Sequence, residues 1–347
     1  MARYNLNITV LKAPLSNVSN STKVHICFLD ASFYHAFAYV IIFVVSMFGN
    51  SMTVAVIIKG KLVSKNAHLF LLNMAIADLV VTVVYMPRMV VMMLYGNSWL
   101  VTGTFGLVLC RTVPFLHHLA ILVPVFTILG ATFDRFCAMV FPLRNIMTRT
   151  VTRIIVVATW LVSAILRSPY LVTPILKPAI GAYQCVSSLG TLFGILLHVY
   201  AKLLLSVYCS SLFITIVLYS ITIFKLRRSK SIGASNDAVQ VRKEKASIKL
   251  FKLFIAVTIC FICCWFVYFF ADIFWNRPFP CELKFFRFFL AHSNSAINPC
   301  LLAVFNDRYR NAYKQIWMKI ISLCTKCNSQ QSPSSSPSVD ETVVTPF

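Results

Sequence analysis

The sequence predicts an all-α membrane protein, a seven-transmembrane helix bundle with a short amphipathic helix on the inner membrane surface. Hydrophobic residues make up 59% of the 347 residues, and the mean hydropathy is +0.78. Only 12% of the residues are charged, about half of the roughly 25% usual in soluble globular proteins. Long apolar segments recur along the chain, and basic residues gather in alternate connections between them. These observations exclude an ordinary cytosolic enzyme.

Seven apolar segments of about 20 residues or more match the length that an α-helix needs to cross a hydrocarbon core of roughly 30 Å. They cover residues 34–58, 67–93, 107–141, 152–173, 197–224, 250–275 and 285–305. Arg167 and Pro169 end the fourth segment, and the seventh contains several polar residues, so these two are the least apolar. We expect residues 34–305 to form the bundle.

The net charge of +22 indicates the topology. With residues 1–33 placed outside, the inner connections hold 21 of the 32 Lys and Arg residues, nine of them in residues 225–252. Cytoplasmic loops of multi-pass membrane proteins carry such an excess. We therefore expect an extracellular N-terminus, a cytoplasmic C-terminus and a location in the plasma membrane. The basic inner face favours membrane lipids as partners and implies no nucleic acid.

Three N-glycosylation sequons crowd residues 1–33, at Asn7, Asn17 and Asn20. Because such glycans decorate surfaces outside the cytoplasm, the sequons support the same orientation independently of the charge. The sequence therefore predicts an extracellular, glycosylated N-terminal segment.

Four of the twelve cysteines lie on the predicted outer side, where an oxidising environment allows disulfides. Four cysteines admit three pairings. We expect Cys110 to pair with Cys185, and Cys27 to pair with Cys281, which would join the first segment to the seventh.

The inner end of the chain divides into two parts. Residues 306–327 predict the amphipathic helix, and Cys324 and Cys327 near its end are candidate palmitoylation sites, with unmodified thiols as the alternative. Residues 328–347 are rich in Ser and Pro and poor in apolar residues, which predicts a disordered cytoplasmic tail.

Several polar residues lie deep in the apolar segments, where each is costly and therefore indicates function. Together with two tryptophans they resemble, in order and one set per segment, the rhodopsin-like family of G-protein-coupled receptors. The resemblance covers about residues 30–320 and is closest to peptide receptors. The motifs are Gly49-Asn50, Leu72-Asn73-Met74-Ala75-Ile76-Ala77-Asp78, Asp134-Arg135-Phe136, Trp160, Phe261-Ile262-Cys263-Cys264-Trp265 and Asn298-Pro299.

The resemblance implies a two-state signalling mechanism. Ligand binding outside would shift the sixth helix at the inner face and free Arg135 from Asp134 to contact a heterotrimeric G protein. Phosphorylation of the Ser-rich tail would then recruit arrestin, with a plain linker as the alternative. The implied switch residues are Asp134, Arg135, Tyr219, Phe261, Trp265, Asn298 and Pro299.

The resemblance also implies a sodium site. Its residues would be Asp78, Asn294, Ser295 and Asn298. Pro124 stands where the family often has a hydroxyl group that completes this site, so sodium is the one cofactor to consider and its binding is in question.

The sequence departs from the family pattern at four further positions. Ser211 and Val267 stand where the fifth and sixth helices usually have prolines, so we expect straighter helices there. Leu302 replaces a usual tyrosine. Ser247 replaces an acid that restrains Arg135 in some members, and we hypothesise raised basal activity.

Basic and aromatic side chains dominate the predicted ligand pocket. Its residues are Arg88, His117, His118, Tyr268, Asp272, Arg287 and His292. Amine receptors of this family carry an aspartate in place of His117, and opsins a Schiff-base lysine in place of His292, so neither an amine nor retinal is expected. The set suits a ligand with carboxylate or other acceptor groups. A peptide is our first hypothesis, and a lipid or small acid is the alternative.

Two other classes fit less well. A transporter or channel needs a continuous polar path, which the single buried acid Asp78 does not supply. An intramembrane enzyme needs a catalytic set, and the apolar segments contain neither a Ser/His pair nor a His-Glu metal motif. We therefore expect a receptor without enzymatic activity.

Overall fold

The computed structural model describes residues 32–60, 66–96, 98–142, 144–179, 182–187, 195–230, 238–274 and 281–330. Its elements are α2 (Ser32–Lys59), α3 (Asn66–Val80), η2 (Val81–Tyr85), α4 (Met86–Tyr95), α5 (Gly103–Val140), α6 (Arg149–Arg167), η3 (Ser168–Leu171), β1 (Pro174–Ala179), β2 (Ala182–Ser187), α8 (Ile195–Lys230), α9 (Ala238–Phe274), α10 (Cys281–Phe305) and α11 (Asp307–Gln330). Seven helical stretches of these residues are long and apolar enough to cross a membrane, which confirms the predicted spans.

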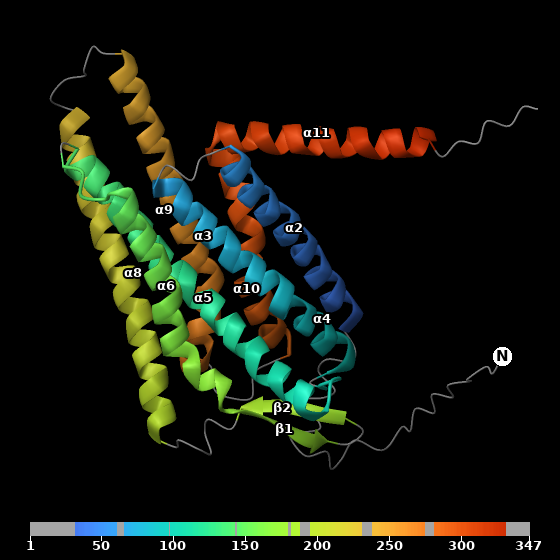
Figure 1. Cartoon of the computed structure of the whole chain (residues 1–347). Coiled ribbons are helices and arrows are strands. Elements are labelled where there is room, and N and C mark those ends of the chain that lie inside the picture. Colours follow the sequence, from blue (N-terminus) through green and yellow to red (C-terminus); the bar gives the residue numbers. More distant parts are fainter. Residues whose placement is uncertain are drawn as a thin grey trace, which may run out of the picture.

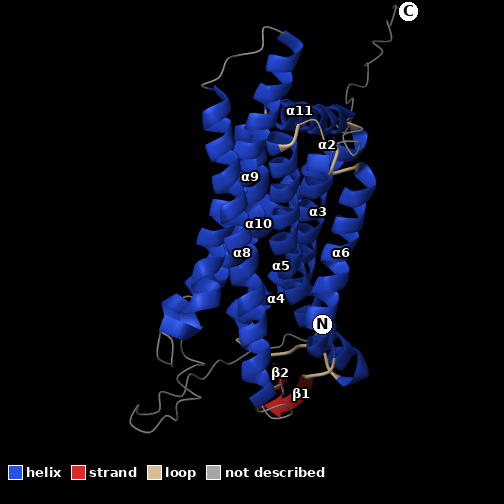
Figure 2. Cartoon of the chain, turned by 90° about the vertical axis from the view of Figure 1, so that its left-hand side faces the viewer, coloured by secondary structure: helices blue, strands red, loops and turns tan. Residues whose placement is uncertain are grey.

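The two ends of the bundle differ. Figures 1 and 2 show α11 lying across one end, the α11 end, and the antiparallel pair β1 and β2 at the opposite end, the hairpin end. The helices α5, α8 and α10 run from the hairpin end to the α11 end, and α6 and α9 run back.

The helix α5 forms the centre of the bundle, where it packs against α3, α6, α8 and α9. Over an 18-residue stretch of its span 61% of the residues are buried, compared with 17% in the span of α6 and η3. Large apolar side chains on the outer helices stay exposed, among them Ile165 at 71% and Phe213 at 69%. Exposed side chains of this kind suit a hydrocarbon solvent, because lipid tails do not penalise them as water would.

Two glycines allow close helix contacts. A Cβ on Gly49 would collide with the ring of Pro299, so α2 and α10 meet where no larger residue fits. A Cβ on Gly130 would lie 3.0 Å from side-chain atoms of both Phe70 and Ile155, so α3, α5 and α6 approach closely there.

The second span changes its hydrogen-bond pattern along its length. It runs as α3, then five residues of π-helix in η2, then α4. Pro87, at the start of α4, has no backbone N–H and its ring pushes away the preceding turn, which explains why the regular pattern breaks just before it.

The hairpin was not predicted, since Pro174, Lys177 and Pro178 leave β1 without a strand-like alternation. Trp99 N donates to Tyr183 O at 2.7 Å, and a disulfide joins Cys110 of α5 to Cys185 of β2. This disulfide confirms one predicted pairing.

Several predictions concern residues outside those described. Cys27, Asn7, Asn17 and Asn20 lie outside the described residues, and so do residues 331–347. The side chains of Cys281, Asp272, Cys324 and Cys327 are likewise not described. The second disulfide, the glycosylation sites and the palmitoylation sites therefore stay predictions.

The amphipathic helix α11 begins one residue after its predicted start and extends to Gln330, three residues beyond its predicted end. Two tyrosines fix it to the bundle, one buried and one half-buried. Tyr309 OH bonds His68 Nδ1 at 2.8 Å, and Tyr313 OH bonds Thr53 Oγ1 at 2.6 Å. Burial raises the pKa of Tyr313 to about 12, so its phenol stays protonated at neutral pH.

Candidate functional site

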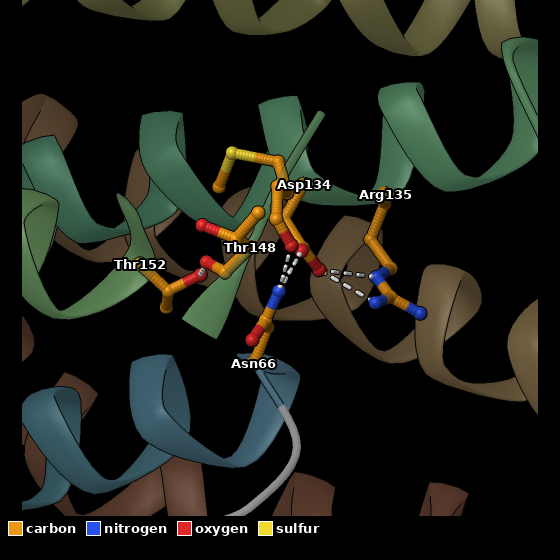
Figure 3. A network of polar contacts seen from close by, with 6 residues as sticks. Asn66, Asp134, Arg135, Thr148 and Thr152 are labelled. Atoms are coloured by element: carbon orange, nitrogen blue, oxygen red, sulfur yellow. Dashed lines mark hydrogen bonds and ion pairs between the residues drawn. The ribbon is translucent and has the colours of Figure 1, made fainter. Parts of the chain in front are cut away.

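A buried ion pair lies at the α11 end of α5. Arg135 Nε and Nη2 donate to Asp134 Oδ2 at 3.0 and 2.5 Å, and their side chains are only 12% and 4% exposed. Asn66 Nδ2, at the start of α3, donates to Asp134 Oδ1 at 3.2 Å and to Met147 O at 2.6 Å (Figure 3). Both carboxylate oxygens therefore have partners, and the guanidinium is held against its own helix.

Asn66 was missed by sequence reasoning, because it precedes the second segment and belongs to none of the quoted motifs. Ser247, which replaces a restraining acid, lies on α9, and no hydrogen bond between it and Arg135 is seen among the described residues. The restraint on Arg135 that the structure shows is thus supplied by Asp134.

A polar contact joins α8 and α9 near the same end. Tyr219 OH and Thr258 Oγ1 lie 3.0 Å apart, and both residues are buried. The Tyr219 ring also packs edge-on against Phe251 with centroids 5.5 Å apart. Neither helix is interrupted at Ser211 or Val267, as expected from the missing prolines.

The helices α9 and α11 are linked at the surface. Lys249 Nζ donates to Asp307 Oδ2 at 2.8 Å, and Arg310 pairs with the same carboxylate. The hydrogen bond from Lys249 lowers the pKa of Asp307. Because these side chains are exposed, the pair contributes little stability.

The middle of the bundle holds the predicted sodium cluster. Ser295 Oγ donates to Asp78 Oδ1 and Asn298 Nδ2 to Asp78 Oδ2, both at 2.8 Å. Asn50 Nδ2 reaches Ser295 O at 2.9 Å. The adjacent cavity has a volume of about 10 Å³, room for about one water-sized sphere.

The predicted sodium ligands differ in how far their hydrogen bonds are satisfied. Each Asp78 oxygen accepts one hydrogen bond, and Pro124 adds no oxygen ligand from its side chain. Asn294 and Asn298 both lie on α10, and their Oδ1 atoms are buried with no hydrogen-bond partner among the described residues. The sodium site stays a prediction, and no step below depends on it.

Two histidines meet in the half of the bundle nearer the hairpin. His117 Nε2 of α5 lies 2.9 Å from His292 Nε2 of α10, and Tyr39 OH of α2 lies 3.2 Å from His292 Nδ1. All three side chains are at most 1% exposed. One imidazole must donate and the other accept in the contact between the two histidines. The series of hydrogen bonds from His117 through His292 to Tyr39 joins α5, α10 and α2.

Aromatic rings enclose this histidine pair. Tyr85 stacks on His117 with centroids 3.5 Å apart, and His118 stacks on Tyr170 at 4.1 Å. Trp265 of α9 meets His292 edge-on at 6.4 Å. His117 Nδ1 and Trp265 Nε1 are buried and have no hydrogen-bond partner among the described residues.

The remaining predicted pocket residues are distributed around this cluster. The Arg287 guanidinium lies over the Tyr268 ring at 5.0 Å. Arg88 instead donates to Ser98 O at 3.1 Å and lies over the Trp99 ring at 4.9 Å, so it helps to anchor the segment after α4. The structure thus brings the two histidines together, and Arg88 follows three residues after Tyr85, which stacks on His117.

The architecture and the motif positions agree with one family. The sequence profile described as 7 transmembrane receptor (rhodopsin family) matches residues 49–302. The chain belongs to this family. The receptor is therefore a member of a family of signalling proteins and not of enzymes.

The receptor is similar to several characterised proteins. It is 26% identical over 287 residues to galanin receptor 2a of Danio rerio, covering 80% of this chain and 76% of that protein. It is 26% identical over 336 residues to the RYamide receptor of Tribolium castaneum, covering 89% and 86%. It is 27% identical over 291 residues to the tachykinin-like peptides receptor 86C of Drosophila melanogaster, covering 78% and 56%.

Proposed function

We propose that the chain is a peptide-activated G-protein-coupled receptor of the plasma membrane. The observation that carries the proposal is the ion pair of Asp134 and Arg135, which holds a nearly buried guanidinium at the α11 end of the central helix. The Arg135 guanidinium could leave Asp134 and contact a G protein when the helices move apart.

The proposed orientation places the α11 end in the cytoplasm. The Cys110–Cys185 disulfide at the hairpin end supports an oxidising, extracellular environment there. The excess of Lys and Arg in the connections at the α11 end supports the same orientation.

The ligand would bind near the histidine pair. The buried Nδ1 of His117 and Nε1 of Trp265 would supply polar contacts, and the Arg287 guanidinium would pair with an acidic or carbonyl group. The relatives named above are receptors for galanin, RYamide and tachykinin-like peptides, which supports a peptide rather than a lipid or small acid.

Transmission would use helices that reach both ends. The helix α5 carries His117 and Asp134 seventeen residues apart, about 26 Å along its axis. Trp265 on α9 contacts the histidine pair, and α9 also carries Thr258, the partner of Tyr219. A ligand that binds one arrangement of α9 better than the other would shift the population toward it.

A peptide library applied to cells that express the chain tests the proposal. We expect at least one peptide to activate G protein in these cells and not in mock-transfected cells. Protease treatment of the active fraction should abolish the response. A response that survives the protease, or that only lipids and small acids produce, would exclude the peptide ligand.

Regulation in the cytoplasm belongs to the same proposal. Phosphorylation of the tail would recruit arrestin, and palmitoylation of Cys324 and Cys327 would anchor the end of α11 to the membrane. Glycans on Asn7, Asn17 and Asn20 would lie outside the cell.

A further inference from the structure

A large apolar cavity opens on the side of the bundle, away from the proposed ligand pocket. It lies between α5, α6 and α8 and has a volume of about 460 Å³. Its lining includes Gly130, Phe133, Ala158, Thr159, Ile214 and Leu218. This volume lies within the range of roughly 300–1,000 Å³ that is typical of small-molecule sites.

The lining offers almost no polar contact. Its one hydroxyl, Thr159 Oγ1, already donates to Val156 O at 2.7 Å and accepts from Asn73 Nδ2 at 3.2 Å. A ligand with a polar group inside the cavity would leave that group without a partner. The occupant must therefore bury hydrocarbon there.

The cavity faces the membrane interior. Residues of its rim are partly exposed on the outside of the bundle: Phe133 at 39%, Val162 at 42% and Ile214 at 46%. Because α5, α6 and α8 all span the membrane, this side of the bundle contacts lipid tails. A membrane lipid therefore reaches the cavity directly.

Two basic residues continue the cavity wall toward the α11 end. Positions 214, 218, 221, 225 and 228 follow one stripe of α8, because residues three and four apart share a helix face. Lys225 lies seven residues beyond Leu218, about 10 Å along the axis. Lys225 and Arg228 are both exposed, and Lys225 Nζ donates to Val140 O at 2.7 Å across the gap to α5.

We propose that this cavity binds one acyl chain of an anionic phospholipid, whose phosphate is held by Lys225 and Arg228. The distance of about 10 Å is shorter than one leaflet of hydrocarbon, about 15 Å or half of a roughly 30 Å core, so one lipid reaches both parts of the site. A sterol would fill the cavity but leave the basic pair without a negative partner, whereas the phospholipid satisfies both.

The site adjoins the receptor's switch residues. Phe133, in the cavity wall, precedes Asp134, and Leu218 precedes Tyr219. The bound lipid therefore packs against the backbone segments that carry the ion pair and the link between α8 and α9. The proposal needs only that the chain spans a membrane, and it holds whichever ligand activates the receptor.

Photo-crosslinking in lipid nanodiscs tests the site. The full chain is reconstituted with phosphatidylglycerol or phosphatidylcholine that carries a photoreactive group on the same acyl chain, and labelling is measured by mass spectrometry. We expect peptides of α5, α6 and α8 that line the cavity to be labelled by the anionic probe at far lower probe content than by the zwitterionic one.

Two pairs of variants separate the parts of the site. Ala158→Phe fills the cavity, and we expect binding of the anionic probe to weaken at least about tenfold, because excluding two methylene groups from burial costs about that factor. Its control is Val157→Phe, whose position is 56% exposed and outside the lining.

The second pair tests the basic residues. Lys225→Gln with Arg228→Gln should weaken binding of the anionic probe about 25-fold, about fivefold for each basic residue. Its control, Arg153→Gln with Arg227→Gln, removes two exposed charges away from the stripe.

Each remaining outcome would overturn the proposal. If labelling by the anionic probe falls with Lys225→Gln and Arg228→Gln but not with Ala158→Phe, the headgroup is attracted without an acyl chain in the cavity. Equal labelling by both probes, or displacement of the anionic probe by cholesterol alone, would show a different occupant. Equal labelling of all variants would show that lipid contacts this side without a site. Thermal unfolding of each variant identifies any that fail to fold, and Leu218→Phe then replaces Ala158→Phe.

Discussion

The substitution Asp134→Asn should raise signalling in the absence of ligand. Arg135 makes two hydrogen bonds to Asp134 Oδ2, and both side chains are nearly buried. Hydrogen bonds to charged groups each contribute about 1.5–3 kcal/mol. An asparagine still offers a neutral acceptor, so we expect the inactive arrangement to lose about 1–2 kcal/mol of stabilisation. This change raises the ratio of active to inactive receptor by roughly 5 to 30-fold.

Ligand-free G-protein activation, divided by the number of receptors at the cell surface, measures this change. The matched control is Asp134→Asn combined with Arg135→Ala, in which the freed guanidinium is absent and the increase should disappear. Unchanged basal activity of Asp134→Asn at equal surface number would refute the restraint by this ion pair. An increase that persists in the double variant would show that Arg135 does not carry it.

Three further substitutions test the packing that positions the site. Tyr39→Phe removes the hydrogen bond to His292 and should lower the free energy of unfolding by about 1 kcal/mol, seen as a lower Tm in detergent. The control Tyr34→Phe, at a 78% exposed position, should leave the Tm unchanged. Equal Tm values for the two variants would contradict the contact. Gly49→Leu should prevent α2 and α10 from packing and abolish surface expression, whereas normal expression would show that the helices can separate there. Cys110→Ser removes the disulfide, which should lower the free energy of unfolding by about 2–4 kcal/mol and reduce surface expression. The control Cys209→Ser, at an exposed free thiol, should change neither. Equal effects of the two substitutions would argue against a structural disulfide.

The sequence predicts the spans well because hydrocarbon imposes length and apolarity on each one independently. The Asp134 and Arg135 pair was expected from the resemblance of residues 134–136 to the receptor family, and the structure contains it. The expected disulfide from Cys110 to Cys185 is present, although the four cysteines of the predicted outer side admit three pairings.

Contacts between distant segments were harder to predict. His117 and His292 could both be placed in the pocket, but that their Nε2 atoms meet depends on how α5 and α10 rotate about their axes. Tyr39 in an apolar segment looks like an ordinary core residue until its hydroxyl is seen at His292. The contacts of Arg88 with Ser98 O and the Trp99 ring could not be predicted either, because they depend on the path of the segment after α4.

Nucleotide exchange on purified heterotrimeric G protein, measured in membranes that contain the receptor or its Arg135→Ala variant, tests the signalling role most directly. Both proteins should be present in equal amounts and should bind the same labelled peptide from the library. We expect the peptide to accelerate exchange with the unaltered receptor and to have no effect with Arg135→Ala. Equal acceleration by the two proteins would contradict the role of Arg135, and no acceleration by any bound peptide would contradict coupling to a G protein.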